Sequence, residues 1–566
     1  MANLKIFSKQ RLTANIIKIA FVALILFVLN LLIFLPDAVY LFKNKVFNYL
    51  LIGFIISPLL LTIPTVLFFW NMRVYYYILA LISAFTPIAL LPVFLINSQP
   101  NTEMLGLILD TNYHEVTELM GWRLIPLILL CIVFFVVFVL ISKKLPGTLS
   151  FKRAGMISLI AIALFLLTPF TRTTKTEYYT QILKNTFKTY HPFRVGDAIG
   201  YLNRELKNVE NYKRDVANFS FGASRQLPDS SGIQKIHVLL IGETARYDRF
   251  SINGYERETS PLLAQQQNLL TFSNVSTSGT MTAIAVPLII SRADASNFDD
   301  HKKEKSILAA YTEAGYKSFW VSNQSKYGLT GNIGMHYNDG NATLFNGWGS
   351  NENNFSGNTD SALIPMIDSI LRAETSDIFM VVHMIGSHWR YILRYPEKFT
   401  KFKPVSDKNR MMMGYPPKEI MNNEYDNSIL FTDYIIDQII NLVNSTGAEA
   451  SITYVSDHGE NLGDNKENPL YFHGYDPQPF TARIPLFIWT SDRFLKNYPE
   501  KFNILKSNKD RPISSGSNVF HTLLDLSGIR IKNHDSTRSI ASPFYKDSEQ
   551  IIRGSNGKLV KFKDLK

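Results

Sequence analysis

The sequence predicts two parts, an N-terminal α-helical domain of five membrane spans and a C-terminal exported α/β domain with a mostly parallel sheet. Three observations predict this fold class. Apolar runs of membrane-spanning length gather in the first 171 residues, short apolar runs alternate with longer amphipathic ones after residue 231, and 566 residues exceed one typical domain. We expect a transmembrane domain over 1–171, interfacial linker helices over 172–230 and an exported domain over 231–566.

The N-terminal part contains five apolar runs of about 17 to 24 residues, each long enough to cross a hydrocarbon core of about 30 Å. They cover residues 14–35, 47–70, 75–96, 124–142 and 154–170. Basic residues in the leading segment and in the second and fourth loops predict that these segments are cytoplasmic. Five crossings then place everything after residue 171 outside the cytoplasm. The first run lacks a small-x-small cleavage site, so we interpret it as a retained anchor.

The composition limits which cross-links the protein can form and which molecules it is expected to bind. Cys131 is the only cysteine, so no disulfide forms within the chain and the exported domain must hold together by packing. The net charge of +11 suits a protein that works against anionic lipid head groups, and we expect no nucleic-acid partner for an exported domain. The aromatic and basic residues of 172–230 suit a membrane interface, although a solvated helical linker fits them equally.

Beyond residue 231, short apolar runs predict strands and longer amphipathic runs predict helices on both faces of the sheet. The predicted strands are Ile236–Ile241, Ser318–Val321, Ile378–His383, Ile452–Val455 and Leu486–Trp489. The predicted helices are Ser306–Ala314, Ala362–Leu371 and Asn427–Val443.

Three of these strands end in groups that bind cations. Glu243 follows the first strand, His383 ends the third and is followed by His388, and Asp457 and His458 follow the fourth. Carboxylate oxygen and imidazole nitrogen bind Zn²⁺ at about 2 Å, and the carboxyl ends of parallel strands are where such sheets carry their sites. The pattern indicates a metal site, whereas ordinary strand-to-loop turns with polar residues facing water are the alternative.

A catalytic metal site also needs a nucleophile. The segment Ser276–Thr282 offers several hydroxyls just before the apolar run Ala283–Ile290. A hydroxyl on a metal loses its proton near neutral pH, and backbone N–H groups at a helix N-terminus can hold a phosphoryl oxygen. The spacing alone does not choose among these hydroxyls, and a Ser/Thr-rich loop that caps the next helix is the alternative.

At this point the sequence resembles the lipid A-type phosphoethanolamine transferases, inner-membrane members of the alkaline phosphatase and sulfatase superfamily. The likeness covers nearly the whole chain. Besides the five spans, its landmarks are Thr111–Leu119, Ile241–Arg246, Asn253–Tyr255, Thr259–Leu263, Ser278–Pro287, Gly386–His388, Arg394–Pro396, Tyr425–Ser428, Ser456–Glu460 and His473–Gly474. The resemblance implies a sulfatase-like catalytic domain of the alkaline phosphatase type in the periplasm.

The resemblance also implies roles for particular residues. Thr282, directly before Ala-x-x-Val-Pro, would be the nucleophile and would hold the catalytic zinc with Glu243, Asp457 and His458. Three groups of residues match family positions that contact substrate or a second metal. They are the histidines His388 and His473, the pair Asn323 and Lys326 with a spacing one residue different from the family's, and the loop carboxylate Glu115.

The chain departs from the family pattern at two positions. The family usually brackets its nucleophile with two cysteines in a disulfide, and here those places hold Ser278 and Leu288. The change leaves the chemistry untouched but removes covalent bracing from the nucleophile loop. It points to a branch of the family whose acceptor differs.

The implied reaction is ping-pong transfer of phosphoethanolamine from phosphatidylethanolamine, through a phospho-threonine, to lipid A or another lipopolysaccharide group, a modification linked to polymyxin resistance. A sulfatase would need a Cys or Ser in C/S-x-P-x-R, which Thr282-Ala-Ile-Ala-Val does not provide. A glycerophosphate transferase related to lipoteichoic acid synthase is the enzymatic alternative. A non-catalytic membrane sensor on the same fold is the alternative from another class.

Overall fold

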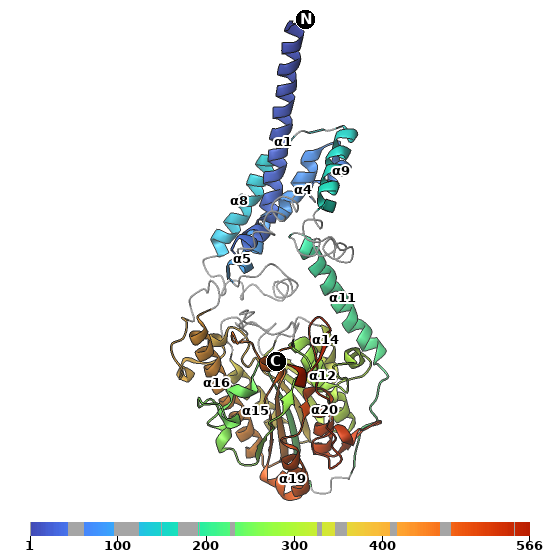
Figure 1. Ribbon diagram of the computed structural model, residues 1–566. Coiled ribbons are helices and arrows are strands. Elements are labelled where there is room, and N and C mark those ends of the chain that lie inside the picture. Colours follow the sequence, from blue (N-terminus) through green and yellow to red (C-terminus); the bar gives the residue numbers. More distant parts are fainter. Residues whose placement is uncertain are drawn as a thin grey trace. The chain divides into compact units, whose positions relative to one another are not determined.

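The computed structural model describes residues 2–43, 61–95, 124–145, 147–148, 150–167, 191, 193–226, 232–324, 331–345, 359–407, 416–464, 477–547 and 549–565. The chain divides into two compact units, one up to Asn203 and one from Arg204 onward. Each unit is described by itself (Figure 1).

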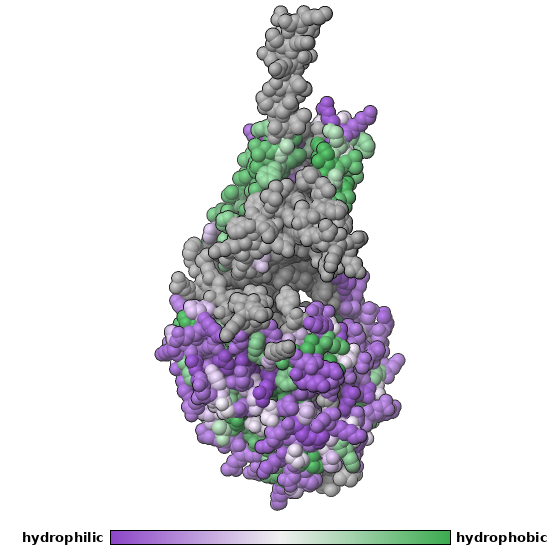
Figure 2. Space-filling model, in the orientation of Figure 1, coloured by the Kyte–Doolittle hydropathy of each residue, from purple (hydrophilic) through white to green (hydrophobic). Residues whose placement is uncertain are grey.

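The first unit is helical. Its described α-helices are α1 (Ala2–Lys43), α4 (Met72–Ala84), α5 (Thr86–Leu95), α8 (Leu124–Ser142) and α9 (Phe151–Leu167), and α11 (Phe193–Asp215) begins in it. Leu29 of α1, Tyr76 of α4 and Phe138 of α8 are buried together in its core. The outward side chains of α8 are apolar, and Figure 2 shows apolar residues (green) gathered on the surface of this unit.

Two described stretches are long and apolar enough to cross a membrane, Phe21–Tyr40 within α1 and Leu124–Ser142. They correspond to the predicted spans 14–35 and 124–142. The predicted span 75–96 is instead two short helices, because α4 ends at Ala84 and Pro87 lies in the first turn of α5. A proline ring disfavours helical backbone at the preceding residue and removes an N–H donor, which favours a helix break at this point.

Five spans are therefore not confirmed. Most of the predicted span 47–70 lies outside the described residues, and its described end contains the 3₁₀ helix Ile63–Phe68. The predicted span 154–170 falls largely in α9, which has 17 residues and begins with Lys152 and Arg153 in its first turn.

The second unit is built on a seven-stranded sheet with the strand order β3–β9–β8–β2–β7–β5–β6. The strands are β2 (Lys235–Gly242), β3 (Leu269–Thr271), β5 (Lys317–Ser322), β6 (Ala342–Phe345), β7 (Ile378–His383), β8 (Glu449–Ser456) and β9 (Leu486–Thr490). The strands from β8 to β6 are parallel, and β9 runs antiparallel to both β8 and β3. The prediction of a mostly parallel sheet is confirmed.

Helices cover both faces of this sheet because its central strands are apolar on both sides. In β2, Leu239 and Ile241 pack in one core with α12 (Thr282–Ile290), α13 (Ile307–Glu313) and α20 (Ser515–Ser527). Val238 and Leu240 pack in the other core with α15 (Leu363–Ala373) and α16 (Lys418–Ser445). Figure 1 shows α12 and α20 on one side of the sheet and α15 and α16 on the other.

The part of the predicted linker from Arg204 onward packs within the second unit. The Tyr212 hydroxyl near the end of α11 lies 3.0 Å from His336 Nδ1 and 2.9 Å from Asp339 Oδ2. Farther along, β1 (Ser224–Arg225) pairs with β11 (Ile529–Arg530). Both contacts join the chain just before the central strand β2 to elements far away in the sequence.

Candidate metal and nucleophile site

The site lies beyond the carboxyl ends of the two central strands. Gly242 of β2 and Ser456 of β8 are register partners, and Asp457 N donates to Gly242 O at 3.0 Å. The next residue after each partner is a carboxylate, Glu243 or Asp457, so the parallel register brings both acids to one edge.

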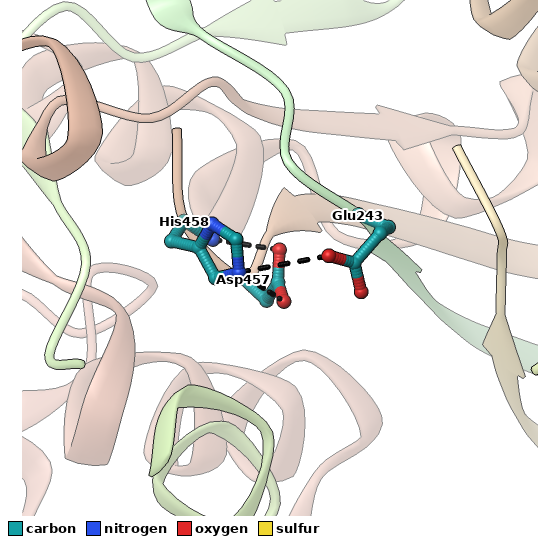
Figure 3. Close-up of side chains that lie close together, drawn as sticks. All are labelled: Glu243, Asp457 and His458. Carbon is teal, nitrogen blue, oxygen red and sulfur yellow. Dashed lines mark hydrogen bonds and ion pairs between the residues drawn. The ribbon is translucent and has the colours of Figure 1, made fainter. Parts of the chain in front are cut away.

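Glu243, Asp457 and His458 form a buried cluster. Each offers a ligand atom, and these atoms all lie within 4.8 Å of one another. His458 Nε2 lies 3.3 Å from Asp457 Oδ2 and 3.5 Å from Glu243 Oε1. Figure 3 shows the imidazole and the two carboxylates pointing toward one another. All three residues are at most 1% exposed.

A backbone contact sets the tautomer of His458. Its Nδ1 lies 2.9 Å from the carbonyl oxygen of Gly459, and a carbonyl can only accept. Nδ1 therefore carries a proton, and in the neutral imidazole Nε2 presents a lone pair to the cluster. Only glycine fits at position 459, because a Cβ there would collide with the Phe480 carbonyl oxygen.

Asp457 leaves one carboxylate oxygen available. Its Oδ1 accepts from the backbone N–H of Thr244 at 2.9 Å and of His458 at 2.7 Å. Its Oδ2 is buried and accepts no hydrogen bond from the described residues, although His458 Nε2 lies 3.3 Å away. A buried unpaired carboxylate oxygen is costly unless a cation occupies the space beside it. Two carboxylates and one imidazole are a donor set suited to Zn²⁺, so the residues present fit this metal.

Thr282 is the first residue of α12 and lies at this cluster. Its hydroxyl oxygen lies 3.2 Å and 3.1 Å from the two carboxylate oxygens of Glu243 and 3.3 Å from His458 Nε2. Thr282 is half-buried, whereas its three neighbours are closed off from solvent. The first turn of a helix also has N–H groups without intrahelical acceptors, which favours an anion there.

The structure separates Thr282 from the other hydroxyls of Ser276–Thr282. Thr277 Oγ1 donates to backbone carbonyls, including that of Asp457, and Ser278 Oγ pairs with Ser514 Oγ at 2.7 Å. The hydroxyls of Ser276 and Thr280 are buried and have no hydrogen-bond partner in the part of the chain that the structure describes. Among the described residues of this segment, Thr282 alone has its hydroxyl against the side chains of the cluster.

The places of the two family cysteines lie against one helix. Gly516 N at the start of α20 donates to Ser278 Oγ at 2.8 Å, and Ser515 Oγ accepts from Ser278 N at 3.1 Å. A Cβ at Gly516 would lie 3.0 Å from Ser278 Cβ and 3.1 Å from Leu288 Cβ. Hydrogen bonds and packing on α20 therefore brace the two sides of the nucleophile segment.

We expect Gly516→Ala to destabilise the protein by about 1–3 kcal/mol, because the new methyl overpacks this contact, even though alanine favours a helix. Thermal unfolding of the detergent-solubilised chain measures the effect. Gly334→Ala is the matched control, since a Cβ there meets only the Tyr337 ring at 4.0 Å. Equal melting temperatures for the two variants would contradict the bracing role of this contact.

Of the five remaining predicted site residues, the structure describes two, His388 and Asn323. His388 Nδ1 lies 2.8 Å from the Trp389 carbonyl oxygen, and His388 is not part of the three-residue cluster. The side-chain amide of Asn323 donates to buried Asp360 at 2.9 Å. Glu115, Lys326 and His473 lie outside the described residues.

His383 lies beneath the site. It is buried against Trp320, with the two ring centroids 5.8 Å apart. Burial lowers the pKa of His383 to about 4 despite the opposing charge of Asp457, so its imidazole is neutral at pH 7. The three-residue cluster does not include it.

Two contacts at the site were not predicted from the sequence. Gln324 Nε2 donates to Glu243 Oε2 at 3.0 Å and to the Met384 carbonyl at 2.9 Å, so it orients the carboxylate. Arg394 Nε donates to the His388 carbonyl at 2.9 Å. Burial lowers the pKa of Arg394 to about 10, while Asp360 and Glu243 oppose the shift, so it remains a cation at pH 7. The segment Arg394–Pro396 was recognised only as a landmark.

Comparisons with known proteins agree with this architecture. The sulfatase family model matches residues 235–529. Phosphoethanolamine transferase EptA of Escherichia coli is 32% identical over 325 residues, which cover 56% of this chain and 57% of that protein. The match thus spans less than two thirds of that relative.

Two solved structures are similar. One is the C-terminal periplasmic domain of EptC from Escherichia coli in complex with Zn, with a TM-score of 0.54 and 26% identity, covering 61% of this chain and 96% of that one. The other is the integral membrane protein lipooligosaccharide phosphoethanolamine transferase A from Neisseria meningitidis. Its TM-score is 0.66 at 22% identity over 91% of this chain and 97% of that one, which shows the shared fold. The chain belongs to the sulfatase family, and its similarity within that family is to phosphoethanolamine transferases.

Proposed function

We propose that this protein is a zinc-dependent phosphoethanolamine transferase with Thr282 as its covalent nucleophile. The observation that carries the proposal is the position of the Thr282 hydroxyl, 3.1 to 3.3 Å from Glu243 and His458 at the start of a helix. A hydroxyl in such a place can be activated and can face a bound phosphoryl group. The named relatives carry out transfer of this kind.

Glu243, Asp457, His458 and Thr282 are the residues that would hold the zinc ion. When bound there, zinc would lower the pKa of the threonine hydroxyl and offset negative charge on the phosphoryl group. Asp457 Oδ2, which is buried without a hydrogen bond from the described residues, and His458 Nε2, which faces both carboxylates, support this assignment. The relative solved in complex with Zn supports it independently.

The protein's own groups act in two displacement steps. In the first, Thr282 Oγ1 forms a bond to phosphorus and the bond from phosphorus to the diacylglycerol oxygen breaks; the threonine loses a proton and the diacylglycerol gains one. In the second, an acceptor oxygen forms the new bond to phosphorus, the bond to Thr282 breaks, and the proton of the acceptor is released. Gln324 holds Glu243 in place in both steps.

The family resemblance supports roles for the other predicted residues. Lys326, with Asn323 near it, would hold phosphoryl oxygens, as would His388 and His473, which could instead bind a second zinc. Glu115 would lie near the point where substrate comes in. Arg394 adds a positive charge that interacts with Glu243, which favours an anionic substrate.

Because the proposed donor is a bilayer lipid, the catalytic domain would need to lie beside a membrane. We propose five spans within 1–171, interfacial linker helices over 172–230 and a periplasmic catalytic domain over 231–566 of a bacterial inner-membrane protein. The two long apolar helices α1 and α8 support anchoring, and the related periplasmic domain and integral membrane protein support the arrangement. The phosphatidylethanolamine donor would then reach the site from the bilayer, and lipid A or another lipopolysaccharide group would be the acceptor.

The alternatives fit less well. Thr282 does not stand in the C/S-x-P-x-R sequence that a sulfatase needs for its formylglycine. A non-catalytic sensor would not need to retain all four site groups. A glycerophosphate transferase shares the threonine nucleophile and differs in the donor, so the donor head group separates it from the proposal.

The detergent-solubilised protein should take label from phosphatidylethanolamine labelled in its ethanolamine group, and peptide mass spectrometry should find the adduct on Thr282. The same experiment with phosphatidylglycerol labelled in its head group is the control and should leave the protein unlabelled. Label from phosphatidylglycerol alone would replace the proposal with the glycerophosphate transferase. Mass spectrometry of lipopolysaccharide from cells with and without the gene identifies the acceptor.

A further inference from the structure

We propose that Thr244 is a positioning residue that holds Glu243 and Asp457 together as a pair of metal ligands. The inference rests on the metal site of the proposed function and assigns to a neighbouring residue the task of assembling it. Thr244 is fully buried and directly follows Glu243 beyond the end of β2.

The backbone of Thr244 is strained. Its φ is 61°, in the left-handed region that favours glycine, and a β-branched side chain is rare there. Glycine would adopt this conformation at less cost. Strained residues of this kind cluster at functional sites, where the surrounding structure compensates for them. A threonine at this position therefore suggests that its side chain makes contacts that glycine could not make.

Thr244 is bonded to both acids. Its hydroxyl donates to Glu243 Oε1 at 2.6 Å, and its backbone N–H donates to Asp457 Oδ1 at 2.9 Å. The side-chain bond fixes the orientation of one carboxylate, and the backbone bond fixes the other. Gln324 also bonds Glu243 and the His458 N–H also bonds Asp457, but Thr244 is the residue that bonds both acids.

The long helix α16 holds the backbone of Thr244 in place through a hydrogen bond. The Tyr425 hydroxyl on α16 donates to the Thr244 carbonyl at 2.6 Å and accepts from Arg246 N at 3.0 Å. Burial raises the pKa of Tyr425 far above its usual value, so the phenol remains a donor. The left-handed turn is therefore tied to a buried helix.

This arrangement lowers the free energy needed to assemble the ligands. Two buried carboxylates repel each other, and rotation of either side chain would relieve the repulsion at the expense of the site. The Thr244 hydroxyl opposes that rotation of Glu243. Outer-shell groups that orient ligands typically contribute about 10- to 100-fold to metal affinity.

The test is the zinc dissociation constant of the detergent-solubilised full chain, measured by competition with a chromophoric chelator. Thr244→Val keeps the shape and the strain and loses the hydroxyl, so we expect binding weaker by about 10- to 100-fold. Thr244→Ser keeps the hydroxyl and should bind zinc nearly as the unchanged protein does. Thr244→Gly relieves the strain and loses the hydroxyl, so it should bind as weakly as the valine variant.

Thr432→Val is the matched control, because it removes a buried threonine hydroxyl that donates to the Ser428 carbonyl within α16. It should leave zinc binding unchanged. The melting temperature of each metal-free variant shows whether it folds, and if the valine variant does not, the comparison of serine with glycine decides the matter. Tight binding by the valine or glycine variant would overturn the role of the hydroxyl. An unchanged protein that binds no zinc would overturn the metal site itself.

Discussion

Thr282→Ala is expected to abolish the covalent enzyme intermediate and to reduce phosphoethanolamine transfer by on the order of 10⁴-fold or more. The alanine removes the hydroxyl that lies 3.1 to 3.3 Å from Glu243 and His458, and no other hydroxyl of Ser276–Thr282 contacts a side chain of the cluster. Incubation with phosphatidylethanolamine labelled in its head group, followed by denaturation and counting of protein-bound label, measures the first effect. Product formation measures the second.

Thr280→Ala is the matched control for this experiment. It removes a threonine hydroxyl two residues earlier in the same segment, which is buried and makes no hydrogen bond. The labelled intermediate should therefore persist. Thr282→Ser should also take up label, because it retains the nucleophilic oxygen. If Thr282→Ala were labelled and Thr280→Ala were not, the nucleophile would be Thr280.

Asp457→Asn is expected to weaken zinc binding by more than the ~100-fold typical of outer-shell changes, because it removes a ligand atom. The substitution is nearly isosteric. Its remaining oxygen can still accept from the N–H groups of Thr244 and His458, while an NH₂ group replaces the unpaired Oδ2 and cannot bind a cation. Zinc content after dialysis and competition with a chelator measure the loss.

The stability of metal-free Asp457→Asn should equal or exceed that of the metal-free unchanged protein, because the substitution removes one of two adjacent buried charges. Asp299→Asn is the control for a general effect of lost charge, since Asp299 is exposed and forms an ion pair with Lys302 in the same 3₁₀ helix. Both variants binding zinc equally well would exclude Asp457 as a ligand.

The strand ends could be predicted from the sequence because their apolar runs are distinct and their carboxyl ends share one edge. The strand ends predict Glu243, Asp457 and His458, which the register of β2 and β8 brings together, but also His383 and His388, which the cluster does not include. The spacing alone could not choose Thr282 among the hydroxyls, because the choice depends on where α12 begins relative to the sheet. The family resemblance selected Thr282, and the structure brings it to the cluster.

Other features needed three-dimensional information at single-residue precision. Neighbouring residues beyond a strand point in different directions, and here Asn323 faces Asp360 while Gln324 reaches Glu243. The edge strands β3 and β6 have only three and four residues, too few to distinguish from loops by periodicity. In the first unit, Pro87 is a signal for a helix break, but a proline alone does not decide whether the helix breaks, because α1 continues through Pro36.

The contact of Ser278 and Leu288 with Gly516 also bears on how the protein matures. Hydrogen bonds and van der Waals packing form as the chain folds and require no electron acceptor. Because Cys131 is the only cysteine, no step of folding within the chain waits for thiol oxidation or disulfide exchange. The second unit can therefore reach its native state at the same rate under reducing and oxidising conditions, independently of oxidoreductases that assist disulfide-bonded proteins.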